Sequence, residues 1–494
     1  MEILNFIAGK WSNAASGEFF TSINPADTRQ VVARAPLSRH DDVDRAVGAA
    51  RKAFPEWRLL PPPRRGEILF RAGEILLREK QKLGELVTRE MGKVLAEGLG
   101  DVQEAIDMAF YMAGEGRRMQ GETVPSELPD KDCKSLREPI GVVALITPWN
   151  FPMAIPAWKI FPALICGNTV VFKPSSDTPA CAAELVRILE EAGVPAGVLN
   201  MVCGSGTDVG EYLATHRGVD AASFTGSCAA GEHLEELLGE MHRPLATEMG
   251  GKNAIIVMDD ADLDLALEGV LWGAFGTTGQ RCTAASRVVV HEKVYENFVA
   301  MLAQAAGRLR LGAGLQKTTD VGPLINERQQ KKVMDYIGVG IAEGAQLVTG
   351  GRPVDAGACA HGFFIKPTVF DRVATTMRIA REEIFGPVVS VLKCTDIDEA
   401  IAIVNNVSYG LSSSIYSRDV NKTARAERDL QAGIVYINAS TIGAEIQLPF
   451  GGWKHSGSGH PEAGGRGGAL DFYSRVKVIY RDFSGRLQKA QIDI

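Results

Sequence analysis

The sequence predicts an α/β protein built on mostly parallel sheets that helices cover on both faces. Short apolar segments typical of strands alternate with amphipathic segments typical of helices, and this alternation occurs in two successive parts of the chain. The chain also has 494 residues, more than one hydrophobic core usually serves. Two or three domains are therefore expected.

The first alternating series precedes residue 250. We expect its strands at 142–146, 169–172, 198–202 and 221–224, and its helices at 158–165, 180–192, 209–215 and 229–238. Long helical patterns occupy 41–54, 64–91 and 96–114 upstream of it.

The second series begins near Lys252. Strands are expected at 254–258, 287–291, 388–393 and 434–438, and helices at 263–275, 294–306 and 397–405. Gly250 and Gly251 mark the best boundary between the two series. The segment 474–480 alternates like a single strand, with no obvious partner nearby.

Composition excludes several classes of protein. The net charge of −7 is spread without long runs, which argues against nucleic acid as a partner. The apolar run 140–172 is interrupted by four prolines, Asn150 and Lys159, so we do not expect it to span a membrane. No signal peptide is evident, no CxxC pair occurs among the eight cysteines, and the histidines lack zinc-site spacing. We expect a cytoplasmic protein without a metal.

Three polar residues indicate nucleophilic chemistry. Cys282 follows a glycine-rich turn in GQRCT, where a nucleophile would be accessible, and the neighbouring Arg281 would favour its thiolate. Glu248, beside two glycines, fits a general base, and Asn150 in PWNFP fits a donor to an oxyanion. The alternatives are a buried structural cysteine, a glutamate on a surface loop and an asparagine that caps the next helix.

Three loops at expected strand ends are candidate phosphate or ribose sites. Gly204, Gly206 and Gly210 follow one strand and open a helix, although their spacing is not GxGxxG. The segment 224–227 (FTGS) ends another strand at a helix N-terminus, and 173–176 (KPSS) ends a third.

Together these segments resemble the aldehyde dehydrogenase superfamily over nearly the whole chain. The similar segments are PWNFP (148–152), FKPSSDTP (172–179), GSGTDVG (204–210), FTGS (224–227), EMGGKNA (248–254), GQRCTA (279–284), EEIFGPV (382–388) and PFGGWKHSG (449–457).

The resemblance implies a role for each residue of the site. Cys282 would form a thioester with the substrate, Asn150 and the Cys282 N–H would stabilise the oxyanion, and Glu248 would activate water. The residues expected to bind the cofactor are Ile146, Thr147, Trp149, Lys173, Ser175, Ser176, Gly206, Gly210, Phe224, Gly226, Ser227, Gly250, Glu383 and Phe385.

The resemblance also implies a domain organisation. Residues 1–120 and 140–250 would form a Rossmann-like dinucleotide-binding domain, and 251–450 an α/β catalytic domain. A hairpin within 121–139 would pair with the C-terminal segment 468–494 as a β oligomerisation arm, which would explain the single strand at 474–480. A homodimer or homotetramer is expected.

The substrate is harder to infer. Phe151, Trp158, Arg281 and Phe450 are expected to contact it. The ending resembles α-ketoglutarate semialdehyde dehydrogenases, and the segment 443–446 resembles aminoadipate semialdehyde dehydrogenases. Succinate semialdehyde and general aliphatic or aromatic aldehydes remain alternatives, and Arg281 would in one alternative serve only to tune Cys282. CoA-acylating relatives lack the glutamate retained here as Glu248, and a non-catalytic relative or a cofactor-free hydrolase fits these residues less well.

Ser176 bears on the choice of cofactor. Strictly NAD-dependent relatives commonly carry a glutamate three residues after the lysine that matches Lys173, and its charge repels the 2′-phosphate of NADP. Because serine carries no charge, we expect NADP to be preferred and NAD to be accepted. Asp177 would restore the repulsion if it turned inward, and Ser176 in the alternative interpretation only ends the strand in a turn.

Overall fold

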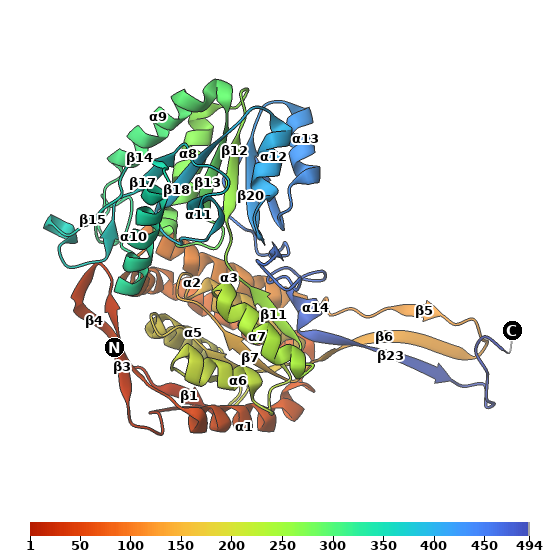
Figure 1. The fold of residues 1–494 in the computed structure, drawn as a ribbon. Helices are drawn as coiled ribbons and strands as arrows, with labels where there is room; N and C mark the ends of the chain where they lie inside the picture. Colours follow the sequence, from red (N-terminus) through yellow and green to blue (C-terminus); the bar gives the residue numbers. More distant parts are fainter. Residues whose placement is uncertain (493–494) are drawn as a thin grey trace.

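The computed structural model describes residues 1–492, which form two α/β units and a projecting three-stranded arm (Figure 1). The expected C-terminal segment 468–494 therefore ends in two residues, 493 and 494, that lie outside the described part. No helix within residues 1–492 combines the length and apolar character needed to cross a membrane.

The first sheet has seven strands in the order β11-β10-β7-β8-β9-β1-β2. They are β1 (Asn5–Ile7), β2 (Lys10–Ser12), β7 (Val142–Ile146), β8 (Thr169–Lys173), β9 (Leu199–Met201), β10 (Ala221–Thr225) and β11 (Leu245–Glu248). The strands β7 to β11 are parallel. At one edge β1 pairs antiparallel with β9, and β2 pairs antiparallel with β1. The carboxyl ends of β7, β8 and β10 thus share one edge, where ligands of such sheets bind.

Successive β7 side chains point to opposite faces of the sheet, and all five are buried. Both faces therefore need helices to cover them. Val143 and Leu145 join a hydrophobic core with α2 to α5, while Val142, Ala144 and Ile146 join a core with α1, α6 and α7. The helices are α1 (His40–Trp57), α2 (Pro62–Met91), α3 (Leu95–Glu115), α4 (Ala154–Cys166), α5 (Pro179–Glu191), α6 (Tyr212–Thr215) and α7 (Cys228–Glu240). A π-helical turn, η1 (Gly206–Glu211), begins the predicted helix 209–215.

The second sheet also has seven strands, in the order β14-β17-β18-β13-β12-β20-β21. They are β12 (Asn253–Val257), β13 (Ala285–His291), β14 (Gln346–Thr349), β17 (Thr368–Asp371), β18 (Val388–Cys394), β20 (Ser412–Tyr416) and β21 (Ile434–Ile437). All neighbours are parallel except β14, which pairs antiparallel with β17 at one edge.

Alternate β12 residues again point to opposite cores. Ile255 and Val257 pack with α8 and α9, whereas Ala254 and Ile256 pack with α10 to α13. These helices are α8 (Leu263–Phe275), α9 (Glu292–Arg308), α10 (Glu327–Ala342), α11 (Arg378–Arg381), α12 (Ile397–Asn405) and α13 (Val420–Asp429). Since β11 ends the first sheet and β12 opens the second, the chain passes between the units over four residues that include Gly250 and Gly251.

The remaining short elements lie outside the two seven-stranded sheets and the arm. They are β3 (Phe19–Asn24), β4 (Asp27–Pro36), η2 (Gly276–Gly279), β15 (Pro353–Val354), η3 (Gly357–Cys359), β16 (Phe364–Ile365), β19 (Tyr409–Gly410), β22 (Trp453–Lys454) and α14 (Ala469–Phe472). After the second unit the chain returns to the first, where Phe450, Ala463 and Leu470 enter the core that holds α4.

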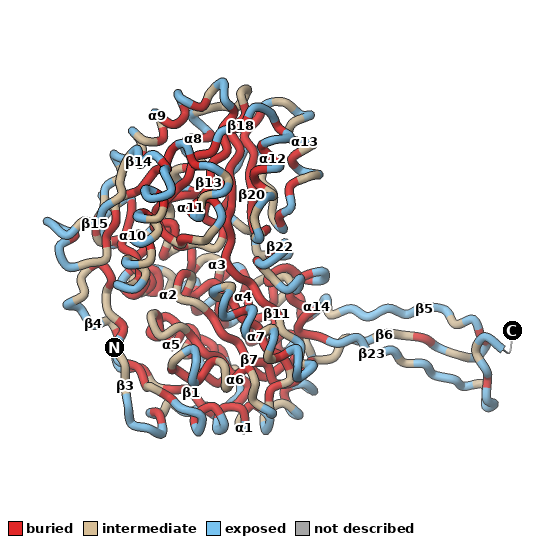
Figure 2. Tube along the Cα trace, viewed as in Figure 1, coloured by how far each residue is buried: buried red, intermediate tan, exposed pale blue. Residues whose placement is uncertain are grey.

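The arm consists of β5 (Thr123–Pro125), β6 (Lys131–Pro139) and β23 (Ser474–Asp482). The strand β23, which the resemblance implied would pair with the hairpin within 121–139, pairs along its length with β6, from Ser474 opposite Pro139 to Asp482 opposite Lys131. The arm extends away from both units, and Figure 2 shows that most of it is exposed. Val476, Val478 and Tyr480 are each more than half exposed, so this strand carries an exposed apolar face.

Candidate active site

Cys282 lies on the loop between η2 and β13, one of the central strands of the second sheet. Gly279 in this loop has a φ of +68°, and a Cβ there would lie 2.2 Å from the Gly386 carbonyl oxygen, so only glycine fits. On the other side of the loop, Asn253 Nδ2 donates a hydrogen bond to the Cys282 carbonyl at 2.7 Å. The backbone of Cys282 is therefore held from both sides.

The Cys282 thiol is partly buried. Burial, together with the carboxylates of Glu248, Glu383 and Glu462, raises its pKa to about 12. The resting thiol is thus protonated, and a base must take its proton when the sulfur attacks. Arg281, which the sequence suggested could favour the thiolate, forms an ion pair with Glu97 at 3.1 Å that balances its charge.

Asn150 follows β7 in the PWNFP turn and is only 3% exposed. Its Nδ2 donates a hydrogen bond to the Gln280 carbonyl at 3.1 Å. An amide nitrogen carries two N–H groups, so a second donor remains for a negative oxygen near the nucleophile loop. Asn150 does not cap α4, because the residue at that N-cap position is Met153 and no side chain caps the helix.

Glu248 ends β11 and is 2% exposed, so it is not the surface-loop residue of the alternative interpretation. One carboxylate oxygen accepts a hydrogen bond from the Gly452 N–H at 3.2 Å, and the other has no partner within residues 1–492. Burial and the neighbouring Glu462 raise its pKa well above the usual glutamate value, although Lys159 opposes the shift. A raised pKa makes the Glu248 carboxylate a stronger proton acceptor than an ordinary glutamate, which suits a general base.

A buried ion pair adjoins Glu248. Lys159 Nζ contacts Glu462 Oε1 and also donates to Ser223 Oγ at 2.6 Å, while Thr225 Oγ1 donates to the same Glu462 oxygen at 2.7 Å. The sequence analysis did not propose Glu462 or Thr225. A signal existed: Lys159 lies within an apolar helix, and a buried cation needs an anionic partner.

A cleft with a volume of about 480 Å³ opens beside Cys282, between the two units. Its first-unit residues follow the carboxyl ends of β7, β8 and β10, and its second-unit residues include Glu383 and Phe385. The rings of Trp149 and Phe385 meet edge-on at 5.5 Å, and the Glu383 carboxylate accepts the Gly251 N–H at 3.1 Å. The N-terminus of α7, capped by Ser227, also faces the cleft, so the residues present fit a phosphate, a ribose and a flat ring.

Twelve of the fourteen expected cofactor residues line this cleft: Ile146, Thr147, Trp149, Lys173, Ser175, Gly206, Phe224, Gly226, Ser227, Gly250, Glu383 and Phe385. Asn150 and Cys282 line it as well. Ser176 and Gly210 do not. The Ser176 hydroxyl is turned to the Gly204 carbonyl, to which it donates at 2.9 Å. A Cβ on Gly210 would lie 3.8 Å from the Lys173 side chain, so Gly210 packs behind that lysine.

The sequence analysis missed seven residues of the lining: Pro148, Ile155, Thr225, Met249, Arg328, Gln329 and Lys332. Pro148 and Met249 belong to the quoted motifs and could have been included. Arg328, Gln329 and Lys332 come from α10, a helix in a part of the chain without any motif. Only the tertiary fold brings α10 to the cleft.

Phe151 and Arg281, two of the expected substrate residues, lie together. Lys93 Nζ is 3.7 Å from the centre of the Phe151 ring, and the Arg281 guanidinium is 5.1 Å from it. Two cations therefore flank one aromatic ring next to the nucleophile loop.

The other two expected substrate residues, Trp158 and Phe450, are buried against each other. Their rings meet edge-on at 5.2 Å and belong to the first-unit core. Neither lines the cleft, so packing accounts for both side chains as they stand. Cys282, Ala444 and Ile446 pack against this same core.

The chain matches the aldehyde dehydrogenase family over residues 11–479. The chain belongs to this family. An α-ketoglutaric semialdehyde dehydrogenase of Bacillus subtilis is 42% identical over 97% of each chain, and an α-ketoglutarate semialdehyde dehydrogenase of Haloferax volcanii is 43% identical over 97% of this chain and 99% of its own. A betaine aldehyde dehydrogenase of Bacillus subtilis is 39% identical over 97% of each.

Solved structures confirm the aldehyde dehydrogenase fold. Betaine aldehyde dehydrogenase of Staphylococcus aureus in complex with NAD+ superposes with a TM-score of 0.95 at 34% identity, covering 98% of this chain and 96% of its own. A 3,6-anhydro-L-galactose dehydrogenase with bound NADP superposes with a TM-score of 0.93 at 32% identity, over 97% and 100%. This aldehyde dehydrogenase is thus similar to enzymes that differ in both aldehyde and cofactor.

Proposed function

We propose that this aldehyde dehydrogenase oxidises a carboxylate-bearing semialdehyde, in first place α-ketoglutarate semialdehyde, to the acid with NADP or NAD. The observation that carries the proposal is the position of Cys282. Its loop adjoins the cleft that fits a dinucleotide, and it also adjoins Phe151 with its two flanking cations. We assign the cofactor to the unit of residues 1–120 and 140–250 and the nucleophile to residues 251–450.

In the proposed reaction, Cys282 Sγ attacks the aldehyde carbon, a C–S bond forms, and the thiol proton passes to a base. The second N–H of Asn150 and the backbone N–H of Cys282 stabilise the resulting oxyanion. The nicotinamide, when bound, accepts the hydride that the carbon loses as the thioester forms. Water deprotonated by Glu248 then cleaves the C–S bond and releases the acid.

The position of Arg281 favours a substrate that carries a carboxylate. Its Nε donates to Thr277 Oγ1 at 2.9 Å and its Nη2 to Glu97 at 3.1 Å, which leaves Nη1 without a hydrogen-bond partner within residues 1–492. A guanidinium held in this way can present the remaining N–H groups to an anion without losing side-chain freedom. The relatives named for α-ketoglutarate and malonate semialdehydes, at 39–43% identity, act on aldehydes that carry a carboxylate.

The substrate is tested by kcat/KM for α-ketoglutarate semialdehyde, propanal and betaine aldehyde in wild type and in Arg281→Leu. We expect the substitution to raise KM for the semialdehyde about ten- to hundredfold, because a charge-assisted hydrogen bond is lost, and to spare propanal. Cys282→Ala, which should oxidise none of the three, is the control for adventitious turnover. Equal losses for the semialdehyde and propanal, or a preference for betaine aldehyde, would contradict the proposed substrate class.

For the cofactor, we propose that NADP is preferred and NAD accepted. Asp177, which would repel a 2′-phosphate if turned inward, accepts a hydrogen bond from Asn326 Nδ2 at 3.1 Å. Lys173 and Ser175 line the cleft, and burial lowers the pKa of Lys173 to about 8, so it remains mostly protonated at pH 7 and can attract phosphate. Ser176 is uncharged, so it neither attracts nor repels the 2′-phosphate of NADP.

The cofactor preference is tested with Ser176→Glu. A glutamate at this position would accept ribose hydrogen bonds and repel the 2′-phosphate, so kcat/KM with NADP should fall by about tenfold or more while NAD is retained. Wild-type discrimination against NADP of more than tenfold would show that the serine does not set the preference.

We also propose a homodimer or homotetramer assembled through the arm. The exposed side chains of Val476, Val478 and Tyr480 on β23 support this assignment, since such an apolar face is unfavourable in water. Light scattering should give a multiple of the 53.1 kDa chain mass. The eight free cysteines suit a reducing compartment, and we propose that the enzyme works in the cytoplasm.

A further inference from the structure

Two threonines before Cys282 adopt a backbone conformation that is unfavourable for their side chains. Thr277 has φ 50° and ψ 28°, and Thr278 has φ 60° and ψ 31°. Within residues 1–492 they are the only adjacent pair of non-glycine residues with positive φ, and the only β-branched residues in that conformation. A β-branched residue stays there only where its surroundings enforce it.

Glu97, from the first turn of α3, supplies one part of that enforcement. Both of its carboxylate oxygens accept the Thr277 N–H, at 2.8 and 3.0 Å. The same carboxylate holds Arg281 Nη2 at 3.1 Å, and Arg281 Nε donates to the Thr277 hydroxyl at 2.9 Å. Gly276 allows this approach, because a Cβ there would lie 3.1 Å from the Glu97 oxygen.

The second unit holds the loop from the opposite side. Thr278 Oγ1 donates to the Gly322 carbonyl at 3.0 Å, and Gln280 Oε1 accepts the Ile325 N–H at 3.0 Å. Both threonines are less than 3% exposed, so solvent does not compete for these contacts. Glu97 is thus the first-unit residue that holds the Thr277 end of this loop, while Asn150 of the same unit contacts it further on, at Gln280.

The loop carries the groups that the reaction needs. Its Gln280 carbonyl accepts the Asn150 amide at 3.1 Å, and the next residues are Arg281 and Cys282. Relaxation of the Thr277–Thr278 turn would therefore displace Cys282 and Arg281 relative to Asn150. A change of about 1 Å in such a constellation is enough to slow a reaction by about a hundredfold.

We propose that Glu97 is a positioning residue, which keeps the Thr277–Thr278 turn in its strained conformation and so aligns Cys282 with Asn150 and Arg281. The proposal rests on the proposed role of Cys282 as the nucleophile. Glu97 does not touch the reacting atoms. It acts through the backbone of Thr277 and through the guanidinium of Arg281.

The experiment compares Glu97→Ala, Glu97→Gln and Thr277→Gly with the double variant Glu97→Ala/Thr277→Gly. We expect Glu97→Ala to lower kcat about ten- to hundredfold and to slow carbamidomethylation of Cys282 by iodoacetamide, followed on the Cys282 peptide across pH. Glu97→Gln, which keeps one accepting oxygen, should lose less. Because glycine adopts positive φ at little cost, Thr277→Gly should restore most of the kcat that Glu97→Ala loses.

Asp107→Ala is the matched control, since Asp107 lies on the same helix, is exposed and binds only Gln103 through its side chain within residues 1–492. It should leave kcat and the alkylation rate unchanged. Folding of every variant is checked by thermal unfolding, and Glu97→Gln serves if Glu97→Ala does not fold. The proposal is overturned if folded Glu97 variants keep kcat and alkylation within about twofold of wild type, or if Thr277→Gly rescues nothing.

The outcome separates this proposal from the proposed function. If wild type oxidises aldehydes and Cys282→Ala does not, but Glu97→Ala is fully active, only the positioning role fails. If wild type oxidises no aldehyde, the proposed function fails, and the alkylation rates at Cys282 still report whether Glu97 sets the loop.

Discussion

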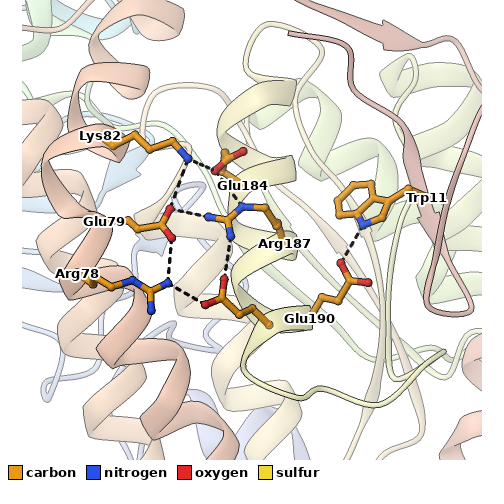
Figure 3. Close-up of polar contacts among 8 residues, drawn as sticks. Trp11, Arg78, Glu79, Lys82, Glu184, Arg187 and Glu190 are labelled. Atoms are coloured by element: carbon orange, nitrogen blue, oxygen red, sulfur yellow. Dashed lines mark hydrogen bonds and ion pairs between the residues drawn. The ribbon is translucent and has the colours of Figure 1, made fainter.

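Two groups of ion pairs in this enzyme contain the same residue types in opposite environments. On the surface, α2 and α5 are joined by a network of Arg78, Glu79, Lys82, Glu184, Arg187 and Glu191. Figure 3 labels the first five of these residues and also shows the contact of Trp11 with Glu190. Near Cys282, Lys159 pairs with Glu462 next to Glu248, and the Lys159 side chain is not exposed at all. The Lys82 side chain, by comparison, is 63% exposed.

The environments have opposite effects on the carboxylates. Burial would raise the pKa of Glu79, but Arg78, Arg187 and Lys82 outweigh it and hold that pKa below its usual value. At Glu248, burial and the second carboxylate of Glu462 dominate, and the pKa is raised in spite of Lys159. The surface network therefore keeps its charges and stabilises the fold slightly, whereas burial beside a second carboxylate makes Glu248 a stronger base than an ordinary glutamate.

The largest expected effect is on the buried carboxyl. Glu248→Gln removes the base while keeping its shape, so we expect one rapid turnover of cofactor reduction followed by thioester hydrolysis slowed about 10²–10⁴-fold. Rapid-quench measurement of the burst and of the steady state checks this.

The pH dependence of Glu248 follows from its raised pKa. The base form exists only above that pKa, so wild-type kcat should rise with pH through a value above the usual glutamate range, and the mutant should lack this rise. Glu190→Gln, on the exposed pair with Trp11, is the matched control and should behave as wild type. Equal steady-state rates for Glu248→Gln and wild type would remove Glu248 from the hydrolytic step.

The next largest effect is on stability. Lys159→Met leaves the Glu462 carboxylate buried without its cation, which costs about 3–5 kcal/mol when one partner of a buried pair is removed. The same exchange at Lys82 removes an exposed contact with Glu184 at 3.1 Å and should cost about 0–1 kcal/mol. Urea unfolding of both variants measures the contrast, and similar losses at the two lysines would refute it.

Sequence reasoning succeeded where the signal was local. The helix α8 and the strand β7 have the predicted bounds, because their apolar periodicity is unbroken. The strands β1 and β2 were not predicted, because three-residue strands carry too little pattern. The pairing of β23 with β6 came from the family resemblance, since more than 300 residues separate the two strands along the chain.

The residues of the site likewise fall into those that local motifs reveal and those that only the tertiary fold reveals. Cys282, Glu248 and Asn150 are found from short motifs, because loops at strand ends carry them. Glu462 was missed because only the fold brings it to Lys159, and the ion pair of Arg281 with Glu97 was missed because a guanidinium beside a cysteine in sequence need not point toward it. Charge pairing across a fold is a tertiary property, so spacing along the chain does not reveal it.

The smallest expected effect concerns the surface network, and it shows most clearly what exposure does. Arg187 contacts Glu79 at 2.6 Å, Glu184 at 3.2 Å and Glu191 at 3.0 Å, yet a third of its side chain is exposed. We expect Arg187→Met to lower the free energy of unfolding by about 1 kcal/mol or less, and this loss should shrink at about 1 M salt relative to about 0.05 M. The pH dependence has a definite sign: because the pKa of Glu79 is lowered on folding, its contribution is present above the usual glutamate pKa of about 4.3 and is lost as pH falls through the lower folded value. Urea unfolding of wild type and mutant at neutral pH and at about pH 3, each at both salt concentrations, measures the difference. If that difference does not change with salt or acid, Arg187 contributes through packing of its aliphatic stem rather than through charge. The difference in stability between the Lys159 and Arg187 variants would then come from burial of the aliphatic parts of these side chains, not from their ion pairs.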